Sequence, residues 1–132
     1  MKKEHTVRDY MTKKVISISP NMNIHHAIKI LLKHKISGAP VVDEDSGLVG
    51  VLSRKDCLKV AFSASYHHDR GGNVSQYMSL DFMTIQPEIS IIAVAELFLK
   101  NPYRQFPVME RGRLVGQISR HDVLKAIDEL WQ

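Results

Sequence analysis

The sequence predicts an α+β fold made of two pseudo-symmetric β-α-β-β-α copies. The phrase GVLSRKD at residues 50–56 returns almost unchanged as GQISRHD at residues 116–122. Matching residues continue on both sides of the phrase at constant spacing, with a single one-residue gap in the turn that precedes it. Such self-similarity is the mark of an internal repeat. Because a solenoid needs at least about three repeats, we expect a pseudo-symmetric pair instead.

Length and composition are those of a globular protein. The chain has 132 residues, of which 44% are hydrophobic and 24% charged, which suits one compact domain with a core. No window reaches the roughly 18 apolar residues of a membrane span, and the first residues lack the apolar stretch of a signal peptide. Cys57 is the only cysteine, so neither a disulfide framework nor a thiolate metal cluster is expected. These observations predict a cytoplasmic location.

Each copy is predicted to open with a short capped turn and an extended segment. The pairs with N-cap and N3 spacing are Thr6 with Asp9 and Asn73 with Gln76,. The extended segments are residues 15–18 and 82–85. A proline soon follows each of them, Pro20 or Pro87, and ends the strand because proline disrupts strand pairing.

An amphipathic helix is predicted after each proline. Asn23 and Ser90 are the expected N-caps,. Apolar residues then recur at intervals of three and four, which predicts one apolar stripe per helix facing a shared core. The stripe residues are Ile24, Ala27, Ile28, Leu31 and Leu32 in the first copy and Ile91, Val94, Ala95, Phe98 and Leu99 in the second.

A β-hairpin and a second helix complete each copy. The paired strands are residues 39–42 with 48–52, and 106–109 with 114–118,. Pro40 and Pro107 place the first strand of each hairpin at a sheet edge or fall at that strand's start. The final helices begin at Ser53 and Ser119. The sequence therefore divides into copies at residues 6–64 and 74–130, joined by a linker at 65–73.

The repeated phrase has two interpretations, and both remain open. Ser53 with Asp56, and Ser119 with Asp122, fit a capping box that needs no ligand,. The same geometry aims backbone N–H groups and the positive end of a helix dipole at one spot, which is an anion site. The aspartate suits the hydroxyls of a ribose, as in dinucleotide folds. The glycine that opens each phrase lets backbone or ligand approach closely.

In these features the chain resembles a tandem pair of CBS domains, the Bateman module, from about Thr6 to Leu130. Three family motifs occur in order in both copies: a Val-x-x-x-Met opening, a Pro-Val-Val-Asp strand, and the repeated phrase. The second copy has the less perfect Pro-Val-Met-Glu. The resemblance implies two β-α-β-β-α CBS motifs packed sheet to sheet as one compact module, with two clefts between them. Family members bind AMP, ADP, ATP, S-adenosylmethionine or sometimes NAD there.

The resemblance also implies a site assignment, residue by residue. In one cleft Ser119, His121 and Asp122 would combine with Lys13, Lys14, Val15, Ile36 and Ser37. In the other Ser53, Lys55 and Asp56 would combine with Phe82, Tyr103 and Arg104. The aspartate would hold the ribose, the serine and the residue before the aspartate would approach the phosphates, and the other copy would receive the base.

The two clefts are not expected to be identical. Lys13 and Lys14 would aid phosphate binding in the first, whereas the second has Leu80 and Asp81 at the matching positions. Tyr103 would stack on a base or fill the cleft. Because each cleft has features for and against it, the sequence does not rank them.

Other patterns favour structural roles. Residues 67–69 (HHD) favour a solvated linker over a metal site, since no third spaced ligand accompanies them,. Cys57 matches Val123 in the other copy, so a buried apolar position is expected. Trp131 is expected to pack the last helix down or to mark a dimer contact. Neither a catalytic set nor a Walker-type loop is present in the sequence.

The sequence therefore predicts a non-catalytic regulatory module that senses an adenine nucleotide, with no required cofactor or metal. The family further implies a homodimer formed through helical faces, in signal transduction with an unknown effector protein. One rival hypothesis is nucleic-acid binding, weakly supported by the net charge of +4 and pI of about 9.3,. The basic residues concerned are Lys2, Lys3, Lys13, Lys14, Lys33, Lys35, Arg54 and Lys55. The other rival is a purely structural dimerisation module with empty clefts.

Overall fold

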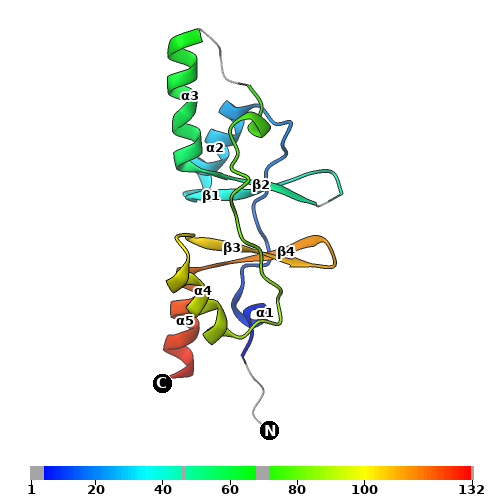
Figure 1. Ribbon diagram of the computed structural model, residues 1–132, viewed down its shortest axis with the longest axis vertical. Coiled ribbons are helices and arrows are strands. Elements are labelled where there is room, and N and C mark those ends of the chain that lie inside the picture. The colour runs from blue at the N-terminus through cyan, green and yellow to red at the C-terminus, as the bar shows by residue number, and fades with distance from the viewer. Residues whose placement is uncertain (1–4, 46, 68–71, 132) are drawn as a thin grey trace. The chain divides into compact units, whose positions relative to one another are not determined.

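The computed structural model describes residues 5–45, 47–67 and 72–131. Its elements in chain order are α1 (Val7–Tyr10), α2 (Ile24–His34), β1 (Gly38–Val42), β2 (Leu48–Ser53), α3 (Arg54–His67), the 3₁₀ turn η1 (Val74–Gln76), α4 (Ile91–Lys100), β3 (Gln105–Glu110), β4 (Arg113–Ser119) and α5 (Arg120–Leu130). Each copy contains a helix, a hairpin and a second helix (Figure 1). The predicted α+β class is confirmed.

The chain folds into two compact units that do not coincide with the two sequence copies. Unit 1 is Met1–Val15 with Met83–Gln132, and unit 2 is Ile16–Phe82. Helix α1, from the first copy, therefore lies in unit 1 with α4, α5 and the β3–β4 hairpin (Figure 1). Turn η1, from the second copy, lies in unit 2 with α2, α3 and the β1–β2 hairpin. The two copies have exchanged their opening segments.

Backbone hydrogen bonds fix each exchanged segment in its unit. The Val7 N–H donates to Ile89 O at 2.9 Å in unit 1, and the Val74 N–H donates to Met22 O at 2.9 Å in unit 2. Both valine side chains are fully buried. Burying a valine contributes about 1.5–3 kcal/mol relative to leaving it exposed, so each exchanged segment is part of its new unit's core.

The predicted caps of these segments are confirmed. The Asp9 carboxylate accepts from the Thr6 N–H at 3.1 Å. The Gln76 side-chain oxygen accepts from the Asn73 N–H at 2.7 Å. An acid and an amide thus perform the same N3 capping role in the two copies.

Both predicted hairpins are present and antiparallel. Strand β1 pairs with β2, and β3 pairs with β4, with a register shift after Val41 and after Val108. The predicted strands at residues 15–18 and 82–85 are much shorter than expected. Each is reduced to one parallel bridge, from Ile18 to Val41 or from Ile85 to Val108.

This short pairing explains why a proline is tolerated inside β1. The Ile18 N–H donates to Pro40 O at 3.0 Å, and the Val42 N–H donates to Ile18 O at 2.9 Å. The N and O atoms of one strand residue point to the same side, so the Pro40 nitrogen faces this sparsely paired edge rather than β2. No ladder hydrogen bond with β2 is lost, and the predicted edge position is confirmed.

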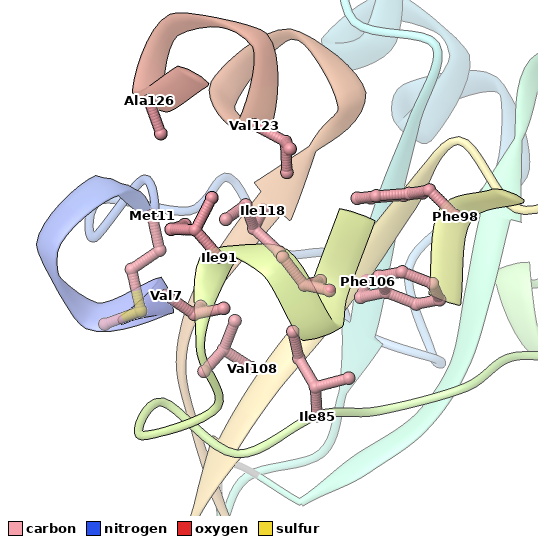
Figure 2. Close-up of a cluster of buried hydrophobic side chains, with 11 residues drawn as sticks. Val7, Met11, Ile85, Ile91, Phe98, Phe106, Val108, Ile118, Val123 and Ala126 are labelled. Atoms are coloured by element: carbon pink, nitrogen blue, oxygen red, sulfur yellow. The ribbon is translucent and has the colours of Figure 1, made fainter. Parts of the chain in front are cut away.

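Each unit has its own hydrophobic core. In unit 1 it joins α1, α4, α5 and the hairpin (Figure 2), through Val7, Met11, Ile85, Ile91, Val94, Phe98, Phe106, Val108, Ile118, Val123 and Ala126. In unit 2 it consists of Ile18, Ile24, Ala27, Leu31, Ala39, Val41, Leu52, Val60 and Val74. The exchanged segments thus contribute side chains to both cores.

The apolar stripes of α2 and α4 are narrower than predicted. Leu32 is 69% exposed and Leu99 is 89% exposed, so placing them in the core was wrong. At 3.6 residues per turn, Leu32 lies about 80° around the helix from Ile24. It therefore falls at the edge of the stripe, where the hairpin no longer covers the helix.

Two predictions about the surface have different outcomes. His25 and His26, which the sequence places on the first helix beside its apolar stripe, are predicted to be surface residues, and both are exposed. Trp131 is 78% exposed, so the expectation that it packs the last helix down was wrong, and its alternative role as a dimer contact stays a prediction. The Trp131 N–H caps α5 by donating to Ile127 O at 3.1 Å, and its indole ring lies outside the core.

The predicted linker begins later than expected, because α3 continues to His67. His68 and Asp69 lie outside the described residues. Within the described ranges, no group of three His, Cys, Asp or Glu side chains is placed to hold a metal ion. Nor does any helix in these ranges combine the length and apolar character needed to cross a bilayer.

Candidate functional site

In unit 1, the start of α5 lies beside the exchanged N-terminal segment. The Thr12 N–H donates to Gln117 O at 2.8 Å, and the Gln117 N–H donates to Thr12 O at 3.0 Å. This two-bond bridge is two residues before Ser119, where β4 becomes α5. Lys13, Lys14 and Val15 follow this bridge along the chain. We call these residues, with residues 119–122, the unit 1 half-site.

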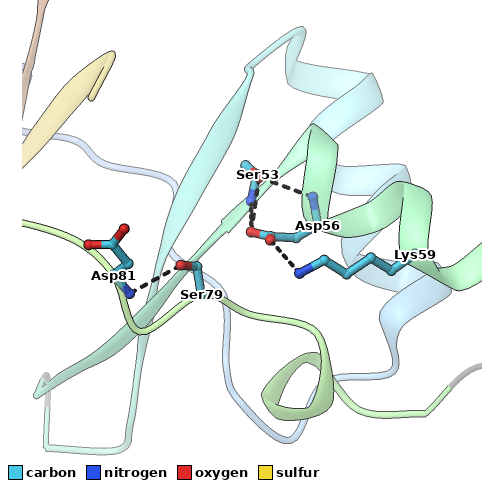
Figure 3. A network of polar contacts seen from close by, with 5 residues as sticks. All are labelled: Ser53, Asp56, Lys59, Ser79 and Asp81. Carbon is cyan, nitrogen blue, oxygen red and sulfur yellow. Dashed lines mark hydrogen bonds and ion pairs between the residues drawn. The ribbon is translucent and has the colours of Figure 1, made fainter. Parts of the chain in front are cut away.

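Unit 2 repeats this arrangement with the other exchanged segment. The Ser79 N–H donates to Val51 O at 2.8 Å, and the Val51 N–H donates to Ser79 O at 3.0 Å. The bridge is again two residues before the serine that ends the second strand, Ser53. Residues 80–82 follow this bridge along the chain, and Figure 3 shows Asp81 on the side of Ser79 that faces away from Ser53 and Asp56. These residues and residues 53–56 form the unit 2 half-site.

The capping box predicted at the start of α5 is confirmed. The Ser119 N–H donates to Asp122 Oδ2 at 2.9 Å, and the Asp122 N–H donates to Ser119 Oγ at 3.2 Å. Two of the otherwise unpaired donors at the helix start are thereby satisfied.

The start of α3 has the same cap with two additional contacts (Figure 3). The Ser53 N–H donates to Asp56 Oδ2 at 2.9 Å, and the Asp56 N–H donates to Ser53 Oγ at 3.1 Å. The Ser53 hydroxyl also donates to Asp56 Oδ2 at 2.9 Å. Lys59 Nζ lies 3.1 Å from Asp56 Oδ1. Asp56 is only 6% exposed, whereas Asp122 is half-buried.

The glycine of each repeated phrase makes room for the exchanged segment. A Cβ at Gly50 would lie 2.6 Å from Met78 Sδ and 3.1 Å from Ser79 O. A Cβ at Gly116 would lie 2.7 Å from Met11 Sδ and 2.9 Å from Thr12 O. The sequence predicted that each glycine lets either backbone or a ligand approach closely. The structure shows the approach of backbone, from Ser79 or Thr12.

The side chains assigned to phosphate differ in their surroundings. Lys55 and His121, one residue before each aspartate, are exposed, and so are Lys13 and Lys14. These four groups are accessible to an anionic ligand. Val15 and Phe82, which follow the bridges in each unit, are half-buried.

The residues before each hairpin contact the adjacent helix start in their own unit. The Arg54 N–H donates to Ser37 O at 2.9 Å, and Arg54 Nε donates to Ile36 O at 3.2 Å. In unit 1 the Arg120 N–H donates to Arg104 O at 3.3 Å. The proposed association of Ile36 and Ser37 with Ser119, and of Tyr103 and Arg104 with Ser53, stays a prediction.

The side chains of Tyr103 and Gln117 contact neighbours on the β3–β4 hairpin. The Tyr103 ring packs edge-on against Phe106, with ring centres 6.1 Å apart, and adjoins the unit 1 core. The Gln117 amide nitrogen donates to Gln105 Oε1 at 2.8 Å across the hairpin. Both side chains thus have partners within unit 1.

Cys57 is half-buried beside Asp56 rather than fully buried as predicted. Burial raises the pKa of its thiol, and the negative charge of Asp56 raises it further. Because a reactive cysteine needs a lowered pKa, this thiol is suited to packing.

Sequence reasoning missed the residues that support the half-sites. Thr12 and Ser79 form the bridges, Met11 and Met78 pack on the glycines, and Lys59 pairs with Asp56. Only Lys59 had a local signal, its i, i+3 spacing from Asp56. The other four depend on contacts between segments distant in sequence.

The basic residues considered for nucleic-acid binding are divided between the two units. Lys13 and Lys14 belong to unit 1, whereas Lys33, Lys35, Arg54 and Lys55 belong to unit 2. Lys2 and Lys3 lie outside the described residues.

Each half-site therefore combines hydrogen-bond donors with a carboxylate acceptor. The helix start and nearby cations favour an anion. The aspartate carboxylate can accept hydrogen bonds from ligand hydroxyl groups. A phosphate joined to a sugar has both kinds of group.

The class of protein is given by the family comparison. The CBS domain model matches residues 7–63 and 74–129, which include both repeated phrases. The chain belongs to the CBS domain family, as a tandem CBS pair.

Two solved structures illustrate the likeness. CBSX2 in complex with AMP superposes with a TM-score of 0.86 at 28% identity, covering 97% of this chain and 99% of that chain; CBSX2 is from Arabidopsis thaliana. The CBS domain pair of protein MJ0100, in complex with 5-methylthioadenosine and S-adenosyl-L-methionine, gives a TM-score of 0.79 at 26% identity. It covers 97% of this chain and 99% of that chain.

The curated relatives include both small CBS proteins and enzymes. CBS domain-containing protein YhcV of Bacillus subtilis is 28% identical, over 89% of this chain and 82% of its own length. Protein MJ1225 of Methanocaldococcus jannaschii is also 28% identical, but this chain spans only 44% of its length. Inosine-5'-monophosphate dehydrogenase of Aquifex aeolicus is 30% identical over 83% of this chain and 22% of its own length.

Proposed function

We propose that this chain is a non-catalytic regulatory module that binds an adenine nucleotide or adenosyl compound. The observation that carries the proposal is the duplicated half-site: a capped helix start and a carboxylate, with exposed cations beside it. The ligands of CBSX2 and of the MJ0100 CBS pair, AMP and S-adenosyl-L-methionine, share an adenosine group.

Each residue of a half-site has a distinct proposed role. Asp56 or Asp122 accepts the ribose hydroxyls, because an ionised carboxylate is an acceptor at both oxygens. The exposed Lys55 and His121, with Lys13 and Lys14, attract phosphate. The hydrogen bonds to the serine hold each aspartate in place before the ligand arrives.

Regulation would follow from differential binding. A ligand shifts a conformational equilibrium only by the difference between its affinities for the two states. The chain passes between its two units twice, at residues 15–16 and 82–83. Each passage directly follows a predicted ligand contact, Val15 or Phe82, so binding at a half-site acts on the connection between units.

A thermal-shift panel with AMP, ADP, ATP, S-adenosylmethionine and GMP tests this function. At a ligand concentration 100 times Kd, an adenosyl ligand should stabilise the fold by about 2.7 kcal/mol. The Asp56→Ala/Asp122→Ala double variant should lose the thermal shift. The Asp56→Asn/Asp122→Asn variant should lose it too, although an amide at N3 can still cap the helix, as Gln76 does. No stabilisation by any adenosyl ligand at millimolar concentration would favour the structural hypothesis instead.

We also propose that the module forms a homodimer through its helices. Leu32 on α2 and Leu58 on α3 are exposed, and so are the matching Leu99 on α4 and Leu124 on α5. Four exposed leucines at repeated positions favour contact with a second copy over chance exposure. Light scattering should give about 30 kDa, twice the 15.0 kDa chain mass, and replacing Leu32 and Leu99 with Asp should give the monomer.

A further inference from the structure

The two aspartates differ in how much hydrogen-bonding capacity they retain. An ionised carboxylate has about four acceptor positions. Asp56 uses three of them, for the Ser53 N–H, the Ser53 hydroxyl and Lys59 Nζ. Asp122 uses one, for the Ser119 N–H. Because a ribose diol brings two donors, Asp122 can receive both, whereas Asp56 must first release a partner.

Lys59 is the partner that distinguishes the two units. Its ammonium group contacts Asp56 Oδ1, the oxygen that the serine leaves open (Figure 3). Lys125 occupies the matching place in α5, three residues after Asp122. Within the described part of the chain, no ion pair joins Lys125 to Asp122. The same residue type at the same spacing therefore restricts one carboxylate and not the other.

The exchanged segments give the unit 1 half-site more positive charge than the unit 2 half-site. Thr12 and Ser79 make equivalent bridges, so the two residues after each enter equivalent positions. These residues are Lys13 and Lys14 in unit 1, but Leu80 and Asp81 in unit 2. All four are exposed. The residues after the bridge therefore add two positive charges in unit 1 and one negative charge in unit 2. Exposed charges act on an anionic ligand over about 10 Å at physiological salt, so this difference favours phosphate in unit 1.

We propose that the half-sites are specialised: unit 1 binds phosphorylated adenine nucleotides more tightly than unit 2, whose half-site carries less positive charge and is held weak by Lys59. This rests on the proposed function of the same half-sites. Lys59 acts as a positioning residue, since it acts on the ligand through Asp56. An uncharged adenosyl compound is the ligand class left to unit 2.

Adenosine titrations of Lys59→Met and Lys125→Met test the positioning role in the full chain. Adenosine has no phosphate, so a change in its affinity reports on the ribose carboxylate rather than on ligand charge. Because the Lys59 side chain is 60% exposed, solvent screens its pairing with Asp56, so Lys59→Met should strengthen adenosine binding at the weaker site by about two- to fivefold,. Lys125→Met, the matched control, should leave adenosine binding unchanged. Equal effects of the two variants would overturn the role of Lys59.

A charge exchange tests the preference for phosphate. Lys14→Asp should weaken AMP binding by about two- to fivefold and leave adenosine binding unchanged, and Asp81→Lys should strengthen the weaker AMP site to a similar extent. Both changes should shrink as salt rises. If Lys14→Asp changes AMP and adenosine alike, specialisation by charge is wrong.

Failure of the proposed function can be distinguished from failure of the proposed specialisation. If the wild type binds neither ligand, the proposed function fails, and the specialisation fails with it. If the Asp56→Ala/Asp122→Ala variant alone loses binding, while all four lysine and aspartate exchanges behave as wild type, the function stands and the specialisation is refuted.

Discussion

Unit 1 and unit 2 have the same order of helices and strands, but their core side chains differ. Phe106 and Phe98, whose ring centres lie 4.3 Å apart, stand in the unit 1 core where unit 2 has Ala39 and Leu31. The bridge, the capping serine and the capping aspartate are nevertheless the same in both. Hydrogen bonds and close glycine contacts define this geometry, so core side chains and nearby charges can diverge without changing it.

The exchanged turns show a second difference. Arg8 on α1 donates through Nη2 to Glu88 Oε1 at 2.6 Å and also pairs with Glu110. The matching residue in η1 is Ser75, which is uncharged and so does not form an ion pair. The N-terminal turn is thus fixed to unit 1 by ion pairs as well as by burial, whereas η1 depends on backbone hydrogen bonds and Val74.

Truncating an aromatic side chain in the unit 1 core should change the free energy of unfolding more than any other substitution considered for comparing the units. Phe106→Ala should reduce the free energy of unfolding by about 3–5 kcal/mol, because the fully buried ring leaves a cavity,. The substitution installs the residue found in unit 2, so the loss measures how far the cores have diverged. Urea unfolding followed by circular dichroism gives the value. A loss below about 1 kcal/mol would show that the unit 1 core closes around alanine as unit 2 does.

Filling the glycine positions should have the next largest effect, and should differ between units. Gly116→Ala should cost about 1–3 kcal/mol, because its Cβ would meet the Thr12 carbonyl at 2.9 Å, and backbone cannot easily move,. Gly50→Ala should cost less, since its closest neighbour is the flexible Met78 side chain and Ser79 O is 3.1 Å away. Thermal unfolding of both variants checks the order. A reversed order would mean that the bridge in unit 2 is the more rigid one.

The smallest effect should be the contribution of Cys57, in unit 2, to the loss of stability at alkaline pH. Cys57 has a raised pKa in the folded chain, so its contribution to stability is constant below the ordinary thiol pKa of 9.0,. Above that pH the unfolded chain releases the proton first, and stability falls as pH rises toward the folded pKa. Cys57→Val, which installs the residue of unit 1, should remove part of the alkaline loss. Urea midpoints at pH 7 and pH 10 provide the measurement, and an unchanged pH dependence would contradict it.

Local features of the fold could be predicted from the sequence. Caps at Thr6, Asn23, Ser90 and Ser119 depend on residues within three positions, and the hairpins depend on short alternating runs. Their outcomes agree with the structure because the physical interactions are themselves local. The repeated phrase located both half-sites for the same reason.

The exchange of opening segments could not be predicted in this way. Val7 and Val74 occupy matched places in two similar copies, so either valine fits either core by its pattern. The decision rests on contacts with Ile89 and Met22, far away in the sequence. The ion pair between Lys59 and Asp56 could not be predicted from spacing alone. Asp122 and Lys125 have the same spacing, yet among the described residues only Asp56 and Lys59 form an ion pair.

Calorimetric titration of AMP into Asp122→Ala and Asp56→Ala tests the central claim most directly. The account predicts that Asp122→Ala removes the tighter AMP binding, because the unit 1 half-site has the open carboxylate and the two lysines. Asp56→Ala should retain that binding, with circular dichroism confirming that both variants are folded. Loss of the tighter binding in Asp56→Ala, with full retention in Asp122→Ala, would contradict the account.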